Sequence, residues 1–188
     1  MTATPNGPAC FPALQTNRLV LRSLTMEDAD FIFRHFRDPG VTQYLLDEPP
    51  LADYAQAQAM IHFYLGPEGK TYNRWGIVRN SDNRLIGTRG YHKWMKAHFR
   101  VEIGFNLCPD CWGQGYMAEA LQAMIRNGFE RMKLNRVNAL VYVGDGRSLR
   151  LLGKMGFKRE GLLRDYFCLD GKSYDHFHLA LLRREWEG

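Results

Sequence analysis

The segment from Cys108 to Glu119 constrains the fold of this chain most, because it places a glycine-containing turn between a strand and a helix. Val101–Leu107 before it has the composition of a strand, and Ala118–Met132 after it carries apolar residues at helical spacing. Glycines let successive backbone N–H groups approach a ligand closely, and the start of a helix adds partial positive charge. The segment therefore predicts an anion site suited to a pyrophosphate. The alternative is a tight turn that binds no ligand.

The spacing within this segment separates it from better-known motifs. Gly113 and Gly115 do not form G-x-G-x-x-G, and no Gly-Lys-Ser/Thr follows, as a Walker loop requires. Cys108-Pro-Asp-Cys111 has the C-x-x-C spacing of disulfide oxidoreductases. The glycines delay the helix to about Met117, too far to activate Cys108. We therefore interpret the cysteines as ordinary turn residues, and a thiol redox protein that uses Cys108 and Cys111 remains an alternative.

The rest of the chain alternates strands and helices in the order of a mixed α/β domain. Thr25-Met-Glu-Asp28 is a variant capping box that opens a first helix, and Asp38-Pro39-Gly40 ends that helix. Asn80–Asn83 and Asp170-Gly171 have the composition of turns. The predicted strands are Arg18–Arg22, Trp75–Val78, Leu85–Tyr91, Val101–Leu107, Asn135–Val143, Lys158–Leu163 and Tyr174–Leu182. The predicted helices are the one after Thr25, Ala52–Leu65, Ala118–Met132 and Ser148–Met155.

Composition excludes several classes of protein. The 188 residues include 25 Lys+Arg and 20 Asp+Glu, a formal net charge of +5, with 45% hydrophobic and 24% charged residues. This is the balance of an ordinary globular chain, so the disordered and fibrous classes are excluded. The length fits one domain over residues 14–188, after a flexible leader at residues 1–13 that lacks the features of a signal peptide.

Charge and cysteine content narrow the partners and the compartment. Lys and Arg are scattered without a run of five or six, which argues against DNA as a partner. The longest apolar runs have the length of strands, which argues against a membrane span. Four cysteines are too few for a disulfide scaffold and favour a cytoplasmic location. The six histidines have no metal-ligand spacing, and Cys10 and Cys168 are isolated, so we predict no metal site.

Ser148 has a structural explanation that needs no catalysis. It follows Asp145-Gly-Arg and is predicted to cap a short helix that Gly156 ends. No Ser-His-Asp or Cys-His arrangement is legible in the sequence.

A set of short segments forms a family pattern in its order and intervals. The segments are Leu14–Arg22, Asp38-Pro39, Ile86-Gly87, Val101–Phe105, Trp112–Ala120, Ser148 with Lys154–Phe157, Arg159–Gly161, Asp170–Lys172 with Asp175, and Arg184–Trp186. The pattern resembles the GNAT superfamily of acetyl-CoA-dependent N-acetyltransferases, and more closely the RimJ/RimL-type branch of ribosomal-protein N-terminal acetyltransferases. The resemblance implies an α/β GNAT fold, in which about four helices flank a mixed, mostly antiparallel seven-stranded sheet. The fourth and fifth strands of that sheet splay apart.

The resemblance also assigns roles to individual residues. The family's pyrophosphate loop falls on Trp112–Met117, and the strand before it would pair its backbone with the pantetheine arm of acetyl-CoA. Met117 replaces a Gly or Ala, Asp145 replaces a frequent Asn, and Leu152 replaces a Tyr that protonates the departing thiolate in many relatives. The residues implied to bind acetyl-CoA are Phe105, Asn106, Leu107, Trp112, Gly113, Gln114, Gly115, Tyr116, Met117, Ala118, Asp145 and Ser148.

The reaction implied is direct acyl transfer from acetyl-CoA to a primary amine in a ternary complex, which needs a base and an acid. We assign Glu102 as the base, acting through water, and Ser148 as the hydroxyl nearest to the missing Tyr. A non-catalytic acyl-CoA-binding module is an alternative from a different class. The acceptor implied is a protein N-terminus, ribosomal or other, or a small amine, and the chain is expected as a monomer or homodimer.

Three aromatic segments are expected to build the acceptor pocket. They are the loop Tyr44–Pro50, the helix residues Tyr54, Met60, Phe63 and Tyr64, and the loop Tyr91–Phe99. Asp47 and Glu48 in the first loop are expected to attract a cationic acceptor.

Overall fold

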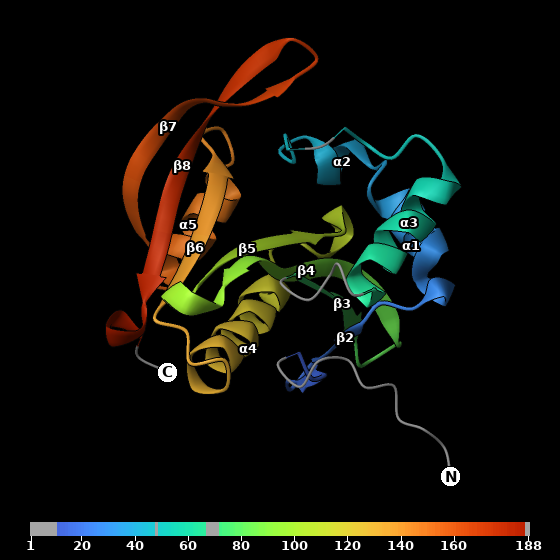
Figure 1. Ribbon diagram of the computed structural model, residues 1–188. Coiled ribbons are helices and arrows are strands. Elements are labelled where there is room, and N and C mark those ends of the chain that lie inside the picture. The colour runs from blue at the N-terminus through green and yellow to red at the C-terminus, as the bar shows by residue number, and fades with distance from the viewer. Residues whose placement is uncertain (1–10, 48, 67–71, 187–188) are drawn as a thin grey trace.

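A computed structural model of the chain describes residues 11–47, 49–66 and 72–186 (Figure 1). These residues form a mixed sheet of eight strands in the order β1-β2-β3-β4-β5-β6-β8-β7, in which only β5 and β6 run parallel. The strands are β1 (Leu14–Gln15), β2 (Leu19–Ser23), β3 (Asn73–Arg79), β4 (Arg84–Met95), β5 (Arg100–Leu107), β6 (Arg136–Tyr142), β7 (Lys158–Leu169) and β8 (Lys172–Leu182). The α-helices are α1 (Ala29–His35), α2 (Pro39–Thr42), α3 (Tyr54–Leu65), α4 (Tyr116–Glu130) and α5 (Gly146–Lys154). The mixed, mostly antiparallel architecture is therefore confirmed.

Two short elements exceed the seven strands and four helices expected from the sequence. The two-residue β1 pairs antiparallel with β2, and two residues are too few to show a periodicity. Helix α2 begins where the first helix was expected to stop. Asp38 caps α2 by accepting a hydrogen bond from the N–H of Gly40 at 2.8 Å, and Pro39 occupies the first helical position, where its missing N–H costs nothing. The stop is thus correct, and the same residues also start a new helix.

The hairpin of β7 and β8 is longer than the sequence indicates. It projects well beyond the neighbouring strands (red in Figure 1). The predicted strand ended at Leu163, but β7 continues to Leu169 across a register shift between Leu163 and Phe167. Asp165 within this irregularity has φ +49° and donates its N–H to a carboxylate oxygen of Asp175 at 2.8 Å. The irregularity breaks the alternation by which a strand is recognised.

Two clusters of buried side chains hold the sheet to its helices. The large cluster joins Trp75 and Ile77 of β3 to residues of α4 and to Leu152 of α5. The smaller cluster joins α1 and α3 through residues such as Ile32 and Ile61. None of the helices in the described ranges is long and apolar enough to cross a membrane.

The packed part of the chain extends further toward the N-terminus than the expected boundary at Leu14. Phe11 is buried in the large cluster and contacts the rings of Trp75 and Tyr91 at centroid distances of 6.0 and 5.9 Å. The indole Nε1 of Trp75 donates a hydrogen bond to the carbonyl oxygen of Pro12 at 3.1 Å. Residues 11–13 are therefore anchored, whereas residues 1–10 of the expected leader lie outside the described part.

Strands β5 and β6 diverge halfway along their length. Their parallel pairing runs from Arg100–Arg136 to Ile103–Ala139. Beyond it, β6 continues on β8 and β5 continues on β4 as far as Leu107. The splay expected between the fourth and fifth predicted strands is therefore present between β5 and β6.

Candidate active site

The turn between β5 and α4 has the backbone that its glycines require. Gly113 has φ +76° and Gly115 has φ +80°, both in the left-handed region that glycine enters without a steric penalty. Gly115 is the N-cap of α4, which begins at Tyr116, close to the start predicted near Met117. A Cβ added at Gly113 would meet no atom within 4 Å. The backbone at Gly113, shortly before the start of α4, is therefore open to a ligand.

Two side chains of the turn hydrogen-bond to its backbone, and the guanidinium of Arg147 lies beside it. The Nε1 of Trp112 donates to the carbonyl oxygen of Leu107 at 2.9 Å, and the Nε2 of Gln114 donates to that of Asp110 at 2.9 Å. The guanidinium of Arg147 lies over the Trp112 ring, 4.2 Å from its centroid. Met117 is buried in the large cluster, so its side chain points away from the turn. Its replacement of a smaller family residue therefore does not obstruct the loop, and Ala118 follows in the first turn of α4.

Strand β5 presents an unpaired edge beside this turn. Phe105, Asn106 and Leu107 pair with β4 on one side and lie past the last β5–β6 partner on the other. The Oδ1 of Asn106 is occupied on the β4 side, where it accepts hydrogen bonds from His35 Nε2 at 2.7 Å and from the Thr88 N–H and hydroxyl at 3.1 and 2.9 Å. The Oδ1 of Asn106 is therefore committed to the β4 side, whereas its backbone lies at the splay.

A cavity of about 130 Å³ occupies the space between β5 and β6. It brings together Glu102 and Ser148, the two residues predicted to be catalytic, although they are 46 positions apart in the sequence. Its other lining residues come from β4 to β6, the loop after α2, the N-cap of α5, and the β7–β8 hairpin. They are Tyr44, Leu45, Leu46, Asp47, His92, Ile103, Gly104, Phe105, Ala139, Leu140, Val141, Tyr142, Asp145, Phe167 and His176.

Glu102 lies at the end of the cavity where the splay begins. Its carboxylate is 3.3 Å from the ammonium of Lys93, and its side chain is 23% exposed. It stands directly opposite His92 in the β4–β5 register, so the two side chains share one face of the sheet. A partly exposed carboxylate with one loose ion pair can still reach solvent water.

Ser148 does not cap its helix, contrary to the prediction. Helix α5 begins at Gly146, and Asp145 is its N-cap, accepting the N–H of Ser148 through Oδ1 at 3.0 Å. The cap moves to Asp145 because its carboxylate sits three residues before the donor, the usual capping distance. Capping therefore leaves the Ser148 hydroxyl unexplained, and it gives Asp145 a structural role beside the cavity. Leu152, at the place of the family's Tyr, is fully buried in the core.

His92 is a cavity residue that the sequence did not single out. Gly104 leaves it room, because a Cβ at Gly104 would lie 2.8 Å from His92 Nε2. Burial, with the nearby charges of Arg74 and Lys93, lowers the pKa of His92 to about 3, so its ring is neutral at neutral pH. Its sequence signal was its place in the segment Tyr91–Phe99, which was expected to build the acceptor pocket, although no role was assigned to His92 itself.

The expected acceptor segments divide between the cavity, the surface and the core. Tyr44 and Asp47 line the cavity, and Tyr44 packs against Tyr142 with ring centroids 5.8 Å apart. Tyr54 and Phe63 are exposed on α3 and do not line it. Tyr91, the last residue of a predicted strand and the first of the expected loop, is a buried β4 residue whose hydroxyl donates to the Met124 carbonyl at 2.6 Å, and β4 continues to Met95 through most of that loop. Met60 and Tyr64 belong to α3, and Glu48 lies outside the described residues.

The environment of the two turn cysteines disfavours thiol redox chemistry. Burial raises the pKa of Cys108 to about 11 and also raises the pKa of Cys111. A raised pKa reduces the thiolate fraction that such chemistry needs. The ring Nδ1 of His35 lies 3.5 Å from the Cys108 sulfur, but burial lowers the pKa of His35 to about 4, so no imidazolium stabilises a thiolate there.

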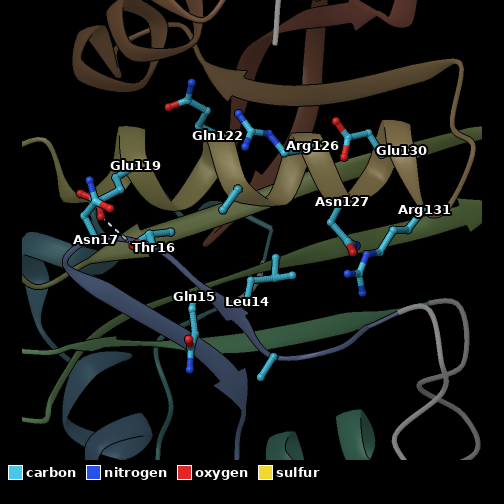
Figure 2. Close-up of a pocket in the computed structure, with 12 residues that line it drawn as sticks. Leu14, Gln15, Thr16, Asn17, Glu119, Gln122, Arg126, Asn127, Glu130 and Arg131 are labelled. Atoms are coloured by element: carbon cyan, nitrogen blue, oxygen red, sulfur yellow. Dashed lines mark hydrogen bonds between the residues drawn. The ribbon is translucent and has the colours of Figure 1, made fainter.

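A larger hollow of about 560 Å³ lies away from the splay, between the N-terminal segment and α4 (Figure 2). Thr16, Glu119, Arg126 and Glu130 are among the residues that line it. Acidic and basic side chains are mixed along its α4 wall, and it contains neither of the residues predicted to be catalytic. The chemistry-bearing residues converge on the smaller cavity instead.

Comparison with known proteins agrees with the geometry. Residues 18–158 match the acetyltransferase (GNAT) domain. The chain is 38% identical to the uncharacterized N-acetyltransferase p20 of Bacillus licheniformis over 93% of this chain and 98% of that protein. It is 28% identical to the ribosomal protein uS5-alanine N-acetyltransferase of Escherichia coli over 92% of each chain.

The fold is shared with solved acetyltransferases. Spermidine N-acetyltransferase from Vibrio cholerae, solved in complex with CoA and spermine, superposes with a TM-score of 0.82. The alignment covers 92% of this chain and all of that one at 19% identity, so it carries the fold alone. Together with the matched domain and the relatives, it leads to one conclusion. The chain belongs to the GNAT acetyltransferase family and is an acyltransferase.

Proposed function

We propose that this protein transfers the acetyl group of acetyl-CoA to the primary amine of a cationic acceptor, by direct attack in a ternary complex. The observation that carries the proposal is the continuity of three features: the glycine turn at the start of α4, the unpaired edge of β5, and the cavity that holds Glu102 and Ser148. Each suits one part of the donor, namely its pyrophosphate, its pantetheine arm and its thioester.

The residues present fit acetyl-CoA as a donor. The backbone from Gly113 to Met117, which is open at Gly113, offers N–H groups and a helix start for the pyrophosphate, whereas the N–H of Trp112 already donates to the carbonyl oxygen of Pro109 at 3.2 Å. The backbone of Phe105, Asn106 and Leu107 offers strand-like pairing for the amide groups of pantetheine. Asp145, already engaged in capping α5, is the weakest of the predicted contacts, because its negative charge is unfavourable beside phosphates.

The charges of the cavity favour a cationic acceptor. Asp47, Glu102 and Asp145 line it, and no Lys or Arg does so among the described residues. Tyr44 and Tyr142 add aromatic faces, which attract ammonium groups. By their names, the Escherichia coli relative acts on an alanine of ribosomal protein uS5, and the Vibrio cholerae enzyme acts on spermidine. As the acceptor we favour a protein N-terminus, which the RimJ/RimL-type branch implies, and a small polyamine is the second candidate.

In this reaction the acceptor must lose a proton before it attacks. Glu102, through a water molecule, takes a proton from the ammonium, and the amine lone pair forms the C–N bond to the thioester carbonyl carbon. As the C–S bond breaks, the attacking nitrogen loses its second proton, and Ser148 relays this proton to the thiolate that leaves. The products are the acetylated amine and free CoA.

Thiol release tests the proposal. The purified chain is mixed with acetyl-CoA and either an alanine-initiated peptide, spermidine or no amine, and free thiol is measured. We expect amine-dependent release, and a Glu102→Gln variant with kcat reduced about 10²-fold or more and an unchanged KM for acetyl-CoA. Glu130→Gln, a carboxylate of α4 outside the cavity, is the control. CoA binding without release for any amine would favour the non-catalytic module instead.

A further inference from the structure

The N-terminal segment grips the start of α4 through one carboxylate. The two oxygens of Glu119 accept hydrogen bonds from the Thr16 hydroxyl at 2.6 Å, the Arg18 N–H at 2.9 Å and the Arg18 Nε at 2.7 Å. Figure 2 shows the bond between Thr16 and Glu119. Partial burial raises the pKa of Glu119, but these hydrogen bonds outweigh it and hold the pKa below its usual value. Glu119 is therefore a charged anchor for Arg18.

Arg18, held by this anchor, contacts the turn itself. Its NH1 donates to the carbonyl oxygen of Gln114 at 3.0 Å, and its guanidinium lies 4.6 Å from the centre of the Tyr116 ring. Its NH2 is 3.4 Å from the place where a Cβ on Gly115 would sit. One side chain from before β2 thus touches three successive residues of the turn.

The bond to Gln114 fixes the direction of a donor. A trans peptide is planar, so its C=O and the N–H of the next residue point in opposite directions. Because Arg18 holds the Gln114 carbonyl toward the N-terminal segment, the N–H of Gly115 is turned to the other side of the turn. A glycine pair with positive φ has many alternative peptide orientations, and this bond selects among them.

The ion pair between Arg18 and Glu119 contributes little to the free energy of folding. The Arg18 side chain is 47% exposed and that of Glu119 is 20% exposed, so water reaches the ion pair from the Arg18 side and reduces its contribution to folding. The large cluster already holds α4 to the sheet through apolar residues. The contacts of Arg18 with Glu119 and Gln114 therefore affect the direction of the backbone more than the free energy of folding.

We propose that Arg18 and Glu119 are positioning residues for the pyrophosphate of the acyl donor: they preset the Gly115 N–H toward it from the far side of the turn. The inference rests on the proposed function in that the turn binds the phosphates of CoA. It adds Arg18, which meets the turn only in three dimensions, and Glu119 of α4, which holds Arg18 there from 101 positions along the chain.

Two acyl donors separate this role from a general structural one. Acetyl-CoA carries the pyrophosphate, whereas S-acetylpantetheine carries the same thioester and arm without it. For Arg18→Gln we expect KM for acetyl-CoA to rise about tenfold with kcat nearly unchanged, and Kd for CoA in calorimetry to rise in parallel. For S-acetylpantetheine we expect kcat/KM within about twofold of wild type, because the orientation of the Gly115 N–H then has nothing to bind.

Matched variants complete the test. Glu119→Gln should shift the same parameters in the same direction, and Arg18→Lys should recover part of the affinity, since Lys keeps a charge but cannot bridge Glu119 and Gln114 at once. Arg126→Gln, also on the wall of the hollow in Figure 2, should leave both donors unaffected. Equal losses with both donors, or folded Arg18→Gln and Glu119→Gln proteins with unchanged Kd for CoA, would overturn the inference. A wild type that binds CoA without transferring acetyl would refute the proposed function alone, because the affinities still decide this one.

Discussion

Asp145 and Ser148 show how one hydrogen bond redistributes roles between neighbouring residues. Ser148 was expected to cap α5, but the structure gives that role to Asp145, three positions earlier. In the structure the carboxylate of Asp145 accepts the N–H of Ser148, so the serine sits inside the first turn of α5 with its side chain beside the cavity. The capping function and the proposed chemical function are therefore separate and can be removed separately.

This separation gives a prediction at the residue scale. Asp145→Ala should lower the free energy of unfolding by about 1 kcal/mol through loss of the cap. Ser148→Ala should change it by less than about 0.5 kcal/mol but lower kcat, since the thiolate loses its donor. Denaturant unfolding and steady-state kinetics on both variants measure the two effects. A Ser148→Ala protein that is destabilised like Asp145→Ala, with wild-type kcat, would restore the capping role to Ser148.

Among the elements, the turn into α4 depends on two glycines that no other residue replaces without strain. Gly115 has φ +80°, whereas Gly153 lies within α5, with no atom within 4 Å of its Cβ position. Gly115→Ala should therefore cost about 1–2 kcal/mol of stability and weaken CoA binding. Gly153→Ala should be neutral or stabilising by up to about 1 kcal/mol, because Ala is the better helix former. Thermal unfolding and calorimetry of the pair check this, and equal behaviour of the two variants would contradict it.

The sequence predicted those elements whose signals are local. The turn around Gly113 and Gly115, the helix α4, and the order of helices and strands along the chain follow from spacing and capping within short windows. The extension of β7 past Leu163 was missed because an irregular register hides the alternation. The contacts of Arg18 with Glu119 and Gln114 were missed for another reason: they join segments about 100 positions apart, and no local pattern records them.

The candidate site was predicted in outline from the family pattern. Glu102 and Ser148 do meet in one cavity, because the family pattern already implies the splay that brings their strands and helix together. His92 was included only as part of the segment Tyr91–Phe99, because its place in the cavity depends on the missing side chain of Gly104 on the adjacent strand. The burial of Phe11 was also not foreseen, since a leader rich in small and polar residues gives no periodic signal.

At the scale of the whole molecule, buried neutral histidines make stability depend on pH. Burial lowers the pKa of His35 to about 4 and that of His92 to about 3, whereas in the unfolded chain both lie near 6.5. Above about pH 6.5 both states are uncharged at these positions. As the pH falls from there toward 4, the unfolded chain binds protons that the folded chain does not, so stability is lost.

The expected size of this effect for His35 alone is on the order of 3 kcal/mol at most, since it is 4% exposed. Thermal unfolding at pH 7 and pH 5 should therefore show a lower Tm at pH 5. His35→Gln should lose less of its Tm over that interval, and His62→Gln, an exposed residue of α3, should lose as much as wild type. A His35→Gln protein with wild-type acid sensitivity would show that His35 does not carry the effect.

The central claim is that acetyl-CoA binds along the β5 edge and the turn into α4, and not in the larger hollow behind α4. Amide hydrogen exchange with and without CoA tests it most directly. We predict slower exchange at Asn106–Leu107 and Gly113–Met117 when CoA is present. Protection confined to the hollow that Figure 2 shows, or no protection at the turn at saturating CoA, would contradict the account.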